Sequence, residues 1–507
     1  MTTAPDRTLL AIPWIAALTT FLVHLVANPH YGFFRDELYF IICGFHPQWG
    51  YVDQPPVVPL LAAATQLGGH SLVLLRAVPA LFAGAGVYVT CRLVAELGGG
   101  RLAQALAAIV FLFTAVLSAF GEKAGPDEVG LWTWPLIALL IVRVVKGADA
   151  RWWLAVGCAA GLSLESKYSV LFFLVAILAG MLLTPVRRIL ADRWFAAGCA
   201  LAIVIALPNF LWQWQNGLPM LELLKNGQAG KNVVAGPLLF LVQQLIITTP
   251  FIAPVWIIGV FWVLRSPQWR FLGLTYVLVM AEMIVLHGKH YYPADVYPIV
   301  IAAGAVPIEA WTRRLLAARV AIVAYAVVAG LVFFPFSAPV LSEDAYVAYE
   351  AKVFTILHMP RQILATEHDR ETSKLPGDWA DMHGWPELAA AVQRVYDGLT
   401  PQDRSRAVVL ADNYGTASAI EFFTPGVPVL STHNQYWIWG LRGYDGSVLV
   451  QVGGTCFKSF HRYDSRTVVT TFSSRWGIGW EQNLPIAICR AKRGPLPELW
   501  PQVKAYR

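Results

Sequence analysis

The chain has 507 residues, of which 57% are hydrophobic and only 14% are charged. Because an ordinary soluble domain carries about 25% charged residues, this composition excludes a typical soluble protein and places most of the chain in a membrane. The formal net charge of +6 is small for this length and argues against nucleic acid as a partner.

Apolar runs of membrane-spanning length follow one another over much of the chain. The first begins at Leu9, is long for a signal peptide and is followed by no Ala-x-Ala cleavage site, so we expect a retained span. A span needs about 20 apolar residues, which predicts about eleven transmembrane helices and a mainly α, polytopic membrane protein. The runs lie near residues 9–28, 72–96, 102–120, 128–146, 152–165, 168–185, 194–212, 237–264, 270–287, 296–312 and 319–336.

Basic residues predict the orientation of these spans. Short cytoplasmic loops are enriched in Lys and Arg, and alternate turns of this chain are basic if the N-terminus is cytoplasmic. Those turns hold Arg92, Arg101, Arg143, Lys146, Arg151, Arg187, Arg188, Arg193, Arg265, Arg270, Arg313, Arg314 and Arg319. We therefore expect a multi-pass protein of the cytoplasmic (inner) membrane whose C-terminal part lies outside the cytoplasm, because the number of spans is odd.

The C-terminal part differs in character, which predicts two domains: a transmembrane module over residues 1–336 and an extracytoplasmic α/β domain over residues 337–507. Apolar segments shorten to strand length, and the spacing of apolar residues from Trp385 to Leu399 is that of an amphipathic helix. The predicted strands cover residues 408–411, 427–430, 448–452 and 486–489. A disulfide between Cys456 and Cys489 suits this location, although spacing alone does not decide it.

An acidic pair, Asp36-Glu37, follows Arg35 directly after the first span. An ionisable group at a membrane surface is expensive and indicates a functional site. Asp36 is our candidate general base, because a carboxylate can take the proton of an attacking hydroxyl. The alternatives are an ion pair with Arg35 or a helix cap, and Glu37 is expected to support or cap.

The outer loop between the third and fourth spans holds a second carboxylate, Asp127, after Pro126. Since this residue precedes a helix, it suits an N-terminal cap, and the functional alternative is a carboxylate that orients substrate hydroxyls. Lys123 suits either a phosphate or the lipid headgroups.

The loop before the tenth span reads His287-Gly-Lys-His-Tyr-Tyr-Pro293 and gathers cations and aromatic residues. Lys289 suits a phosphate, because a cation stabilises the charge that develops on a leaving phosphate. His287, His290, Tyr291 and Tyr292 accompany it, and an interfacial Lys/Tyr belt is the alternative. The two histidines with Asp36 or Asp127 leave a divalent metal open, without a ligand spacing that identifies one.

The order of these features resembles the GT-C glycosyltransferases, in the bacterial branch of the lipid A aminoarabinose transferases and the related protein O-mannosyltransferases. The resemblance rests on Asp36-Glu37, on Gly50-Tyr-Val-Asp-Gln-Pro-Pro56, on Pro126-Asp127 and on Lys289-His-Tyr-Tyr-Pro293. The second outer loop, Glu122-Lys-Ala-Gly-Pro-Asp127, departs from the Arg- and Tyr-containing form of that branch. The sugar and the acceptor therefore stay open.

The resemblance implies an inverting transfer of a sugar from a polyprenyl-phosphate donor to a lipid, glycan or protein acceptor in the cell envelope. Asp36 would be the catalytic carboxylate, Asp127 the acidic residue of the second loop, and Lys289, helped by Arg35 or Lys123, the cation at the lipid phosphate. Tyr51, Asp53 and Gln54 would shape the cavity, and the activated donor implies no nucleotide or redox cofactor. The alternatives are a transporter or lipid flippase, for which outer-face charges without a detectable repeat are unusual, and a non-catalytic assembly protein.

Overall fold

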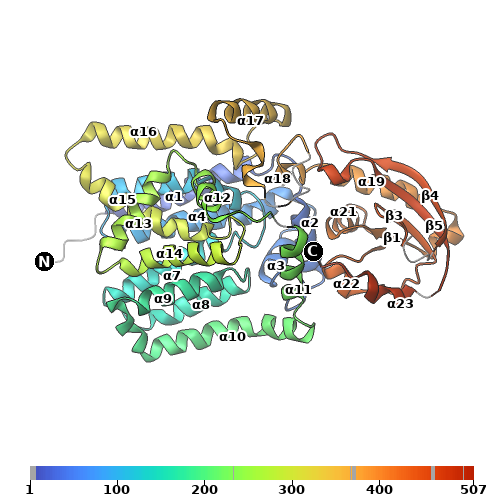
Figure 1. Ribbon diagram of the computed structural model, residues 1–507, viewed down its shortest axis with the longest axis horizontal. Coiled ribbons are helices and arrows are strands. Elements are labelled where there is room, and N and C mark those ends of the chain that lie inside the picture. Colours follow the sequence, from blue (N-terminus) through green and yellow to red (C-terminus); the bar gives the residue numbers. More distant parts are fainter. Residues whose placement is uncertain are drawn as a thin grey trace. The chain divides into compact units, whose positions relative to one another are not determined.

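The computed structural model describes residues 7–231, 233–365, 367, 373–457, 463–494 and 496–506. The chain is mainly helical, and many of its elements are labelled in Figure 1. It divides into two compact units. The first comprises the residues up to His30, Val73–Phe210 and Val234–Leu341, and the second comprises Tyr31–Leu72, Leu211–Val233 and the chain from Ser342 onward.

The first unit is a helical assembly rich in apolar residues. Its α-helices are α1 (Arg7–Ala27), α4 (Leu72–Glu96), α5 (Arg101–Phe113), α6 (Ala115–Phe120), α7 (Gly130–Val145), α8 (Trp152–Leu164), α9 (Val170–Leu182), most of α10 (Arg193–Gln215), α12 (Pro237–Ile247), α13 (Ala253–Arg265), α14 (Arg270–Val285), α15 (Tyr297–Trp311) and α16 (Leu316–Phe333). Short 3₁₀ segments are η1 (Pro185–Ala191), η3 (Ala294–Val296) and η4 (Phe334–Phe336).

Several of these helices suit a membrane. Among the described residues, four are long and apolar enough to cross one, and the bent pair α9 and η1 would make a fifth. The four are Leu72–Glu96, Arg193–Gln215, Ala294–Trp311 and Leu316–Phe336. Further helices, such as α5, α7 and α13, are apolar but shorter. The expectation of several apolar helices is confirmed, and the count of eleven stays a prediction.

The spanning candidates differ in how far their side chains are covered by protein. The apolar window in Ala294–Trp311 is 78% buried, whereas that in Leu316–Phe336 is 11% buried. An apolar helix that neighbouring helices leave uncovered is suited to lipid contact, while a covered one forms the interior of the bundle. Helix α15 is therefore the central helix of this unit, and it packs against α5 and α13.

Two glycines allow α13 and α15 to approach closely. A Cβ added to Gly259 would lie 1.9 Å from the carbonyl oxygen of Val300, and one added to Gly304 would lie 1.8 Å from that of Val255. Small residues at a helix crossing let the backbones touch, which is how helices pack where the hydrophobic effect is weak.

We predict that Gly259→Ala destabilises this unit, because the added methyl meets a backbone atom that cannot move aside. The expected cost is about 1–3 kcal/mol, seen as a lower midpoint of thermal unfolding in detergent. Gly236→Ala is the matched control, since an added Cβ there meets nothing within 4 Å. Equal midpoints for the two variants would show that the crossing is not tight.

The second unit combines helices with a sheet. Its helices are α2 (Arg35–Phe45), α3 (Val57–Ala64), α11 (Pro219–Asn226), the π-helical η2 (Gly227–Lys231), α17 (Glu343–Leu357), η5 (Arg361–Leu364), α18 (Gly377–Ala380), α19 (Trp385–Asp397), α20 (Pro401–Arg404), α21 (Tyr414–Phe423), α22 (Gln435–Trp439), η8 (Gly479–Glu481), α23 (Leu496–Leu499) and η9 (Trp500–Val503). Its strands are β1 (Ala407–Ala411), β2 (Val429–Ser431), β3 (Val448–Val452), β4 (Tyr463–Phe472) and β5 (Leu484–Lys492).

The five strands form one sheet in the order β2-β1-β3-β5-β4. Strands β1, β2 and β3 are parallel, and β5 pairs antiparallel with β3 and β4. The four predicted strands correspond to β1, β2, β3 and β5, and the predicted amphipathic helix corresponds to α19. Strand β4 was not predicted, because it is an edge strand that is mostly exposed and shows no buried apolar run.

Buried strands form the core of the sheet. All residues of β1 and β3 are buried, which suits the interior of a sheet covered on both faces. Cys456 and Cys489 belong to this core, and the structure joins them by a disulfide. The pairing that spacing could not decide is thus present.

The order of the parallel strands determines where the residues of the site lie. Strand β1 lies between β2 and β3, so the chain moves to opposite sides of β1 in its successive crossovers. In open α/β sheets, functional residues gather at the carboxyl ends of the strands near such a reversal. Here the residues after β1 and β2 are Asn413-Tyr414 and His433-Asn434, and α2 packs against α21.

Candidate active site

Helix α2 begins with the acidic pair predicted from the sequence. The backbone N–H of Phe34 donates to Glu37 Oε2 at 2.8 Å, and the Glu37 side chain is fully buried. This contact satisfies a backbone donor that the first turn of a helix would otherwise leave without a partner. Glu37 therefore caps α2, and Asp36 is the member of the pair that remains accessible.

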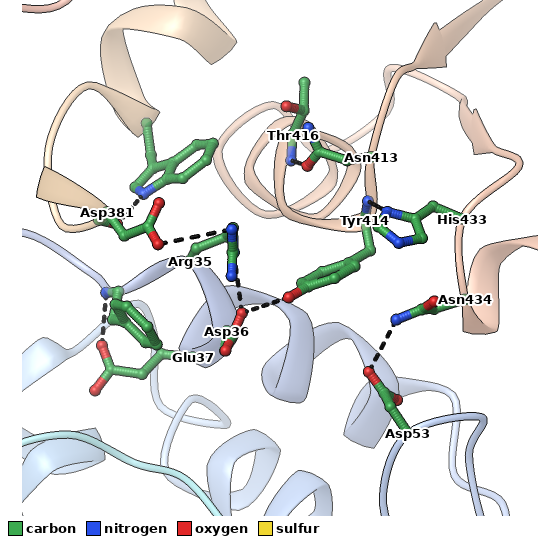
Figure 2. A network of polar contacts seen from close by, with 12 residues as sticks. Arg35, Asp36, Glu37, Asp53, Asp381, Asn413, Tyr414, Thr416, His433 and Asn434 are labelled. Atoms are coloured by element: carbon green, nitrogen blue, oxygen red, sulfur yellow. Dashed lines mark hydrogen bonds and ion pairs between the residues drawn. The ribbon is translucent and has the colours of Figure 1, made fainter. Parts of the chain in front are cut away.

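One oxygen of the Asp36 carboxylate accepts from two side chains (Figure 2). Its Oδ1 accepts from Arg35 Nε at 3.1 Å and from the Tyr414 hydroxyl at 2.8 Å. The side chain keeps 29% of its surface exposed. A carboxylate that is fixed yet accessible suits direct contact with a substrate.

Arg35 is buried and surrounded by anionic and aromatic groups. Its guanidinium lies 3.6 Å from Asp381 Oδ2 and faces the rings of Tyr414 at 5.3 Å and Trp480 at 5.6 Å. Burial alone lowers the pKa of Arg35, but the charges of Asp381 and Asp36 raise it well above its ordinary value. Arg35 therefore stays charged and stabilises the ionised form of its neighbour Asp36.

Helix α21 fits closely against this arginine. Its N-cap is Asn413, whose Oδ1 accepts from the N–H of Thr416 at 2.9 Å. The next position after Tyr414 is Gly415, where an added Cβ would lie 2.3 Å from Arg35 Cγ. Any larger residue would displace the arginine, so the sequence Asn-Tyr-Gly-Thr at the start of α21 matches the packing of Arg35.

A second carboxylate, Asp53, is held in a similar way. Its Oδ1 accepts from the Tyr39 hydroxyl at 3.1 Å, and its Oδ2 accepts from Asn434 Nδ2 at 3.2 Å. Burial raises the pKa of Asp53 to about 7, although the hydrogen bond from Tyr39 acts in the opposite direction. Asp53 thus changes its charge near neutral pH.

Tyr51 and Gln54 organise the loop that carries Asp53. The Tyr51 hydroxyl donates to the carbonyl of Cys43 at 2.7 Å, and the Tyr51 N–H donates to the carbonyl of Gln54 at 2.9 Å. Both side chains are buried. Tyr51 thus ties this loop to the end of α2, and its carbonyl also accepts from Gln213 Nε2 of α10 at 2.9 Å.

We predict that Asp53→Asn makes unfolding less sensitive to pH. In the folded protein Asp53 holds its proton up to about pH 7, whereas in the unfolded chain it ionises near pH 4, so its contribution to stability falls between these values. The variant should unfold at the wild-type temperature near pH 4 and on the order of 5 °C higher near pH 8. The measurement is thermal unfolding in detergent across this range.

Asp344→Asn is the control for this experiment, because that side chain is 72% exposed. It should leave the pH dependence unchanged. A constant difference between Asp53→Asn and wild type at every pH would contradict the assigned titration.

The first unit holds the predicted residues of the other two outer loops. Asp127 is paired with Lys167 in the turn between α8 and α9, and the Lys167 ammonium faces the rings of Tyr291 at 5.5 Å and Tyr292 at 5.0 Å. Burial lowers the pKa of Lys167, but the charge of Asp127 raises it, and the net direction is upward. The predicted Asp127 therefore meets a cation that the sequence analysis did not assign to the site.

The remaining predicted residues of this unit lie on the loop between α6 and α7 and on the loop between α14 and η3. Lys123 and Lys289 are partly buried, His287 is exposed, and His290 is buried. The loop of Lys123 is anchored by a buried contact between Glu122 Oε1 and His24 Nδ1 at 3.0 Å. The described residues contain no group of three or more His, Cys, Asp and Glu side chains arranged to hold a metal.

Sequence reasoning missed the partners of the predicted carboxylates. Tyr414 is 378 residues from Asp36, and Asn434 is 381 residues from Asp53. Asp381, the partner of Arg35, was missed for the same reason. The available signal was a predicted strand, residues 408–411, followed by Asp-Asn-Tyr-Gly, because an Asn after a buried strand is typical of a helix N-cap.

The chain is similar to known proteins in part of its sequence and in its fold. A family model described as dolichyl-phosphate-mannose-protein mannosyltransferase matches residues 53–212, which is less than half of the chain. No curated protein sequence matches the chain. Solved structures of similar fold include three at identities of 13–14%.

ArnT from Cupriavidus metallidurans bound to undecaprenyl phosphate is similar with a TM-score of 0.60 and 13% identity, over 95% of this chain and 98% of that one. Its apo form gives 0.57 and 14%, over 94% and 97%. The mycobacterial arabinofuranosyltransferase AftD gives 0.51 and 14%, over 96% of this chain and 40% of that one. The chain thus has a fold similar to that of GT-C glycosyltransferases, which confirms the resemblance at the level of fold, and its apolar helices indicate a multi-pass membrane protein.

Proposed function

We propose that the chain transfers a sugar from a polyprenyl-phosphate donor to an acceptor hydroxyl or amine, with inversion at the anomeric carbon. The observation that carries this proposal is the Asp36 carboxylate, which is fixed by Arg35 and Tyr414 and remains partly exposed. The likeness in fold to ArnT, whose structure contains undecaprenyl phosphate, supports a polyprenyl-phosphate donor.

In this reaction Asp36 is the general base. The acceptor atom attacks the anomeric carbon from the face opposite the phosphate, and the new bond forms as the bond from that carbon to the phosphate oxygen breaks. The acceptor proton becomes more acidic as attack proceeds and passes to Asp36. Arg35 and Tyr414 both donate to this carboxylate and so favour its ionised form, which is the form that accepts the proton.

The departing polyprenyl phosphate gains one negative charge, so it needs cations nearby. We assign this role to Lys289, with Lys123 as its helper. Arg35 was the other candidate helper, but its carboxylate partners support a role in holding Asp36. Asp127 and its partner Lys167 would orient hydroxyl groups of the sugar or acceptor.

We further propose that the protein lies in the cytoplasmic membrane with its N-terminus inside and residues 337–507 outside. The alternation of basic turns supports this orientation. The Cys456–Cys489 disulfide also supports it, since disulfides persist in oxidising compartments. The acceptor would then be a lipid, glycan or protein of the cell envelope.

We predict that Asp36→Asn lowers the turnover rate by about 10²- to 10⁴-fold, because the amide cannot accept the acceptor proton. Release of polyprenyl phosphate by purified protein in nanodiscs is the measurement, and Asp344→Asn is the exposed control that should retain activity. Full activity of a folded Asp36→Asn protein would reject Asp36 as the base. A transporter or flippase would release no polyprenyl phosphate in either form.

A further prediction concerns the disulfide. In membranes prepared without reductant, peptide mass spectrometry should find Cys456 linked to Cys489, and replacing both by Ser should cost about 2–4 kcal/mol of stability. Free thiols at both positions in freshly trapped cells would oppose the extracytoplasmic assignment. Cys158 and Cys199, which the structure leaves unpaired with other cysteines, provide the internal control for thiol labelling.

A further inference from the structure

The C-terminal sheet holds both carboxylates of the first outer loop. Tyr414, directly after β1 and its short turn, donates to Asp36, and Asn434, after β2, donates to Asp53. Gln435 adds two contacts, since its N–H donates to the Tyr39 hydroxyl at 3.2 Å and its Oε1 accepts from the N–H of Val52 at 3.1 Å. The carboxyl ends of two neighbouring parallel strands thus organise the loop that carries the proposed base.

Contacts on its backbone and on its ring hold Tyr414 in place. Its N–H lies 3.4 Å from His433 Nδ1, and its ring is 4.9 Å from that of His433 and 4.5 Å from that of Tyr39. The Asn413 cap sets the start of the helix that carries it. Figure 2 shows the phenol directed from α21 toward Asp36 at the start of α2.

The chemistry of the phenol matches this position. Burial raises the pKa of Tyr414 well above its ordinary value, so the hydroxyl keeps its proton and donates at any physiological pH. A donor on Oδ1 stabilises the ionised carboxylate and fixes its rotation. Arg35 supplies charge to the same oxygen, while Tyr414 supplies a neutral donor from a distant part of the chain.

We propose that Tyr414 is a positioning residue of the transferase, and that the C-terminal sheet acts in the chemistry by orienting Asp36 through this hydroxyl. This inference rests on the proposed function and gives the C-terminal sheet a direct role in turnover. It also predicts that residues 337–507 cannot be removed without loss of turnover.

The test compares Tyr414→Phe with Tyr436→Phe in purified full-length protein. Tyr436 is the matched control, since it is also buried in this unit and also donates to a carboxylate, Glu421 Oε2, at 2.7 Å. We expect Tyr414→Phe to lower kcat about 10- to 100-fold with an unchanged KM for the donor. The acid limb of its pH profile should move to higher pH, because a carboxylate that loses a donor takes up its proton at higher pH.

Wild-type kcat and pH profile in a folded Tyr414→Phe protein would overturn the inference, as would an equal shift in Tyr436→Phe. Asp36→Asn, measured in parallel, distinguishes a failure of this inference from a failure of the proposed function. If Asp36→Asn retains full activity, the proposed function itself is rejected. Should Tyr414→Phe fail to fold, Asn413→Ala loosens the helix start while keeping the phenol. That variant should shift the acid limb in the same direction, and an unchanged limb would overturn the inference.

Discussion

The charged contact between Arg35 and Asp36 is the interaction on which the proposed site depends. A carboxylate near a membrane surface is costly unless a cation and donors stabilise its ionised form. Arg35 provides the charge, and in turn its own burial is tolerated because Asp381 and two aromatic rings surround it. Removing one of these charged side chains would leave the remaining buried charge with less compensation.

Much of this architecture follows from sequence patterns. Apolar runs, four of the five strands and the amphipathic helix from Trp385 were predictable because burial imposes periodicity on each segment. Asp36, Asp127 and Lys289 could be proposed because ionisable residues at the edge of apolar runs are unusual. Strand β4 gave no such signal, because its side chains are exposed at consecutive positions and so on both faces.

The partners of those residues could not be predicted, for a physical reason. Tyr414 reaches Asp36 through the order of strands in the sheet, and Lys167, after α8, reaches Asp127, before α7, because α8 packs against α7. Such contacts depend on which elements become neighbours, a property of topology that a single sequence does not display. The fold resemblance to GT-C enzymes at 13–14% identity shows the same point, because the fold persists while most side chains differ.

The measurement that tests the central claim most directly uses the wild-type protein in lipid nanodiscs with a panel of polyprenyl-phosphate sugars and a membrane extract as acceptor source. The account predicts that one donor releases polyprenyl phosphate only when acceptor is present, and that the anomeric configuration of the product is inverted relative to the donor. Folded protein that releases polyprenyl phosphate from no donor, or a product with retained configuration, would contradict direct attack assisted by Asp36.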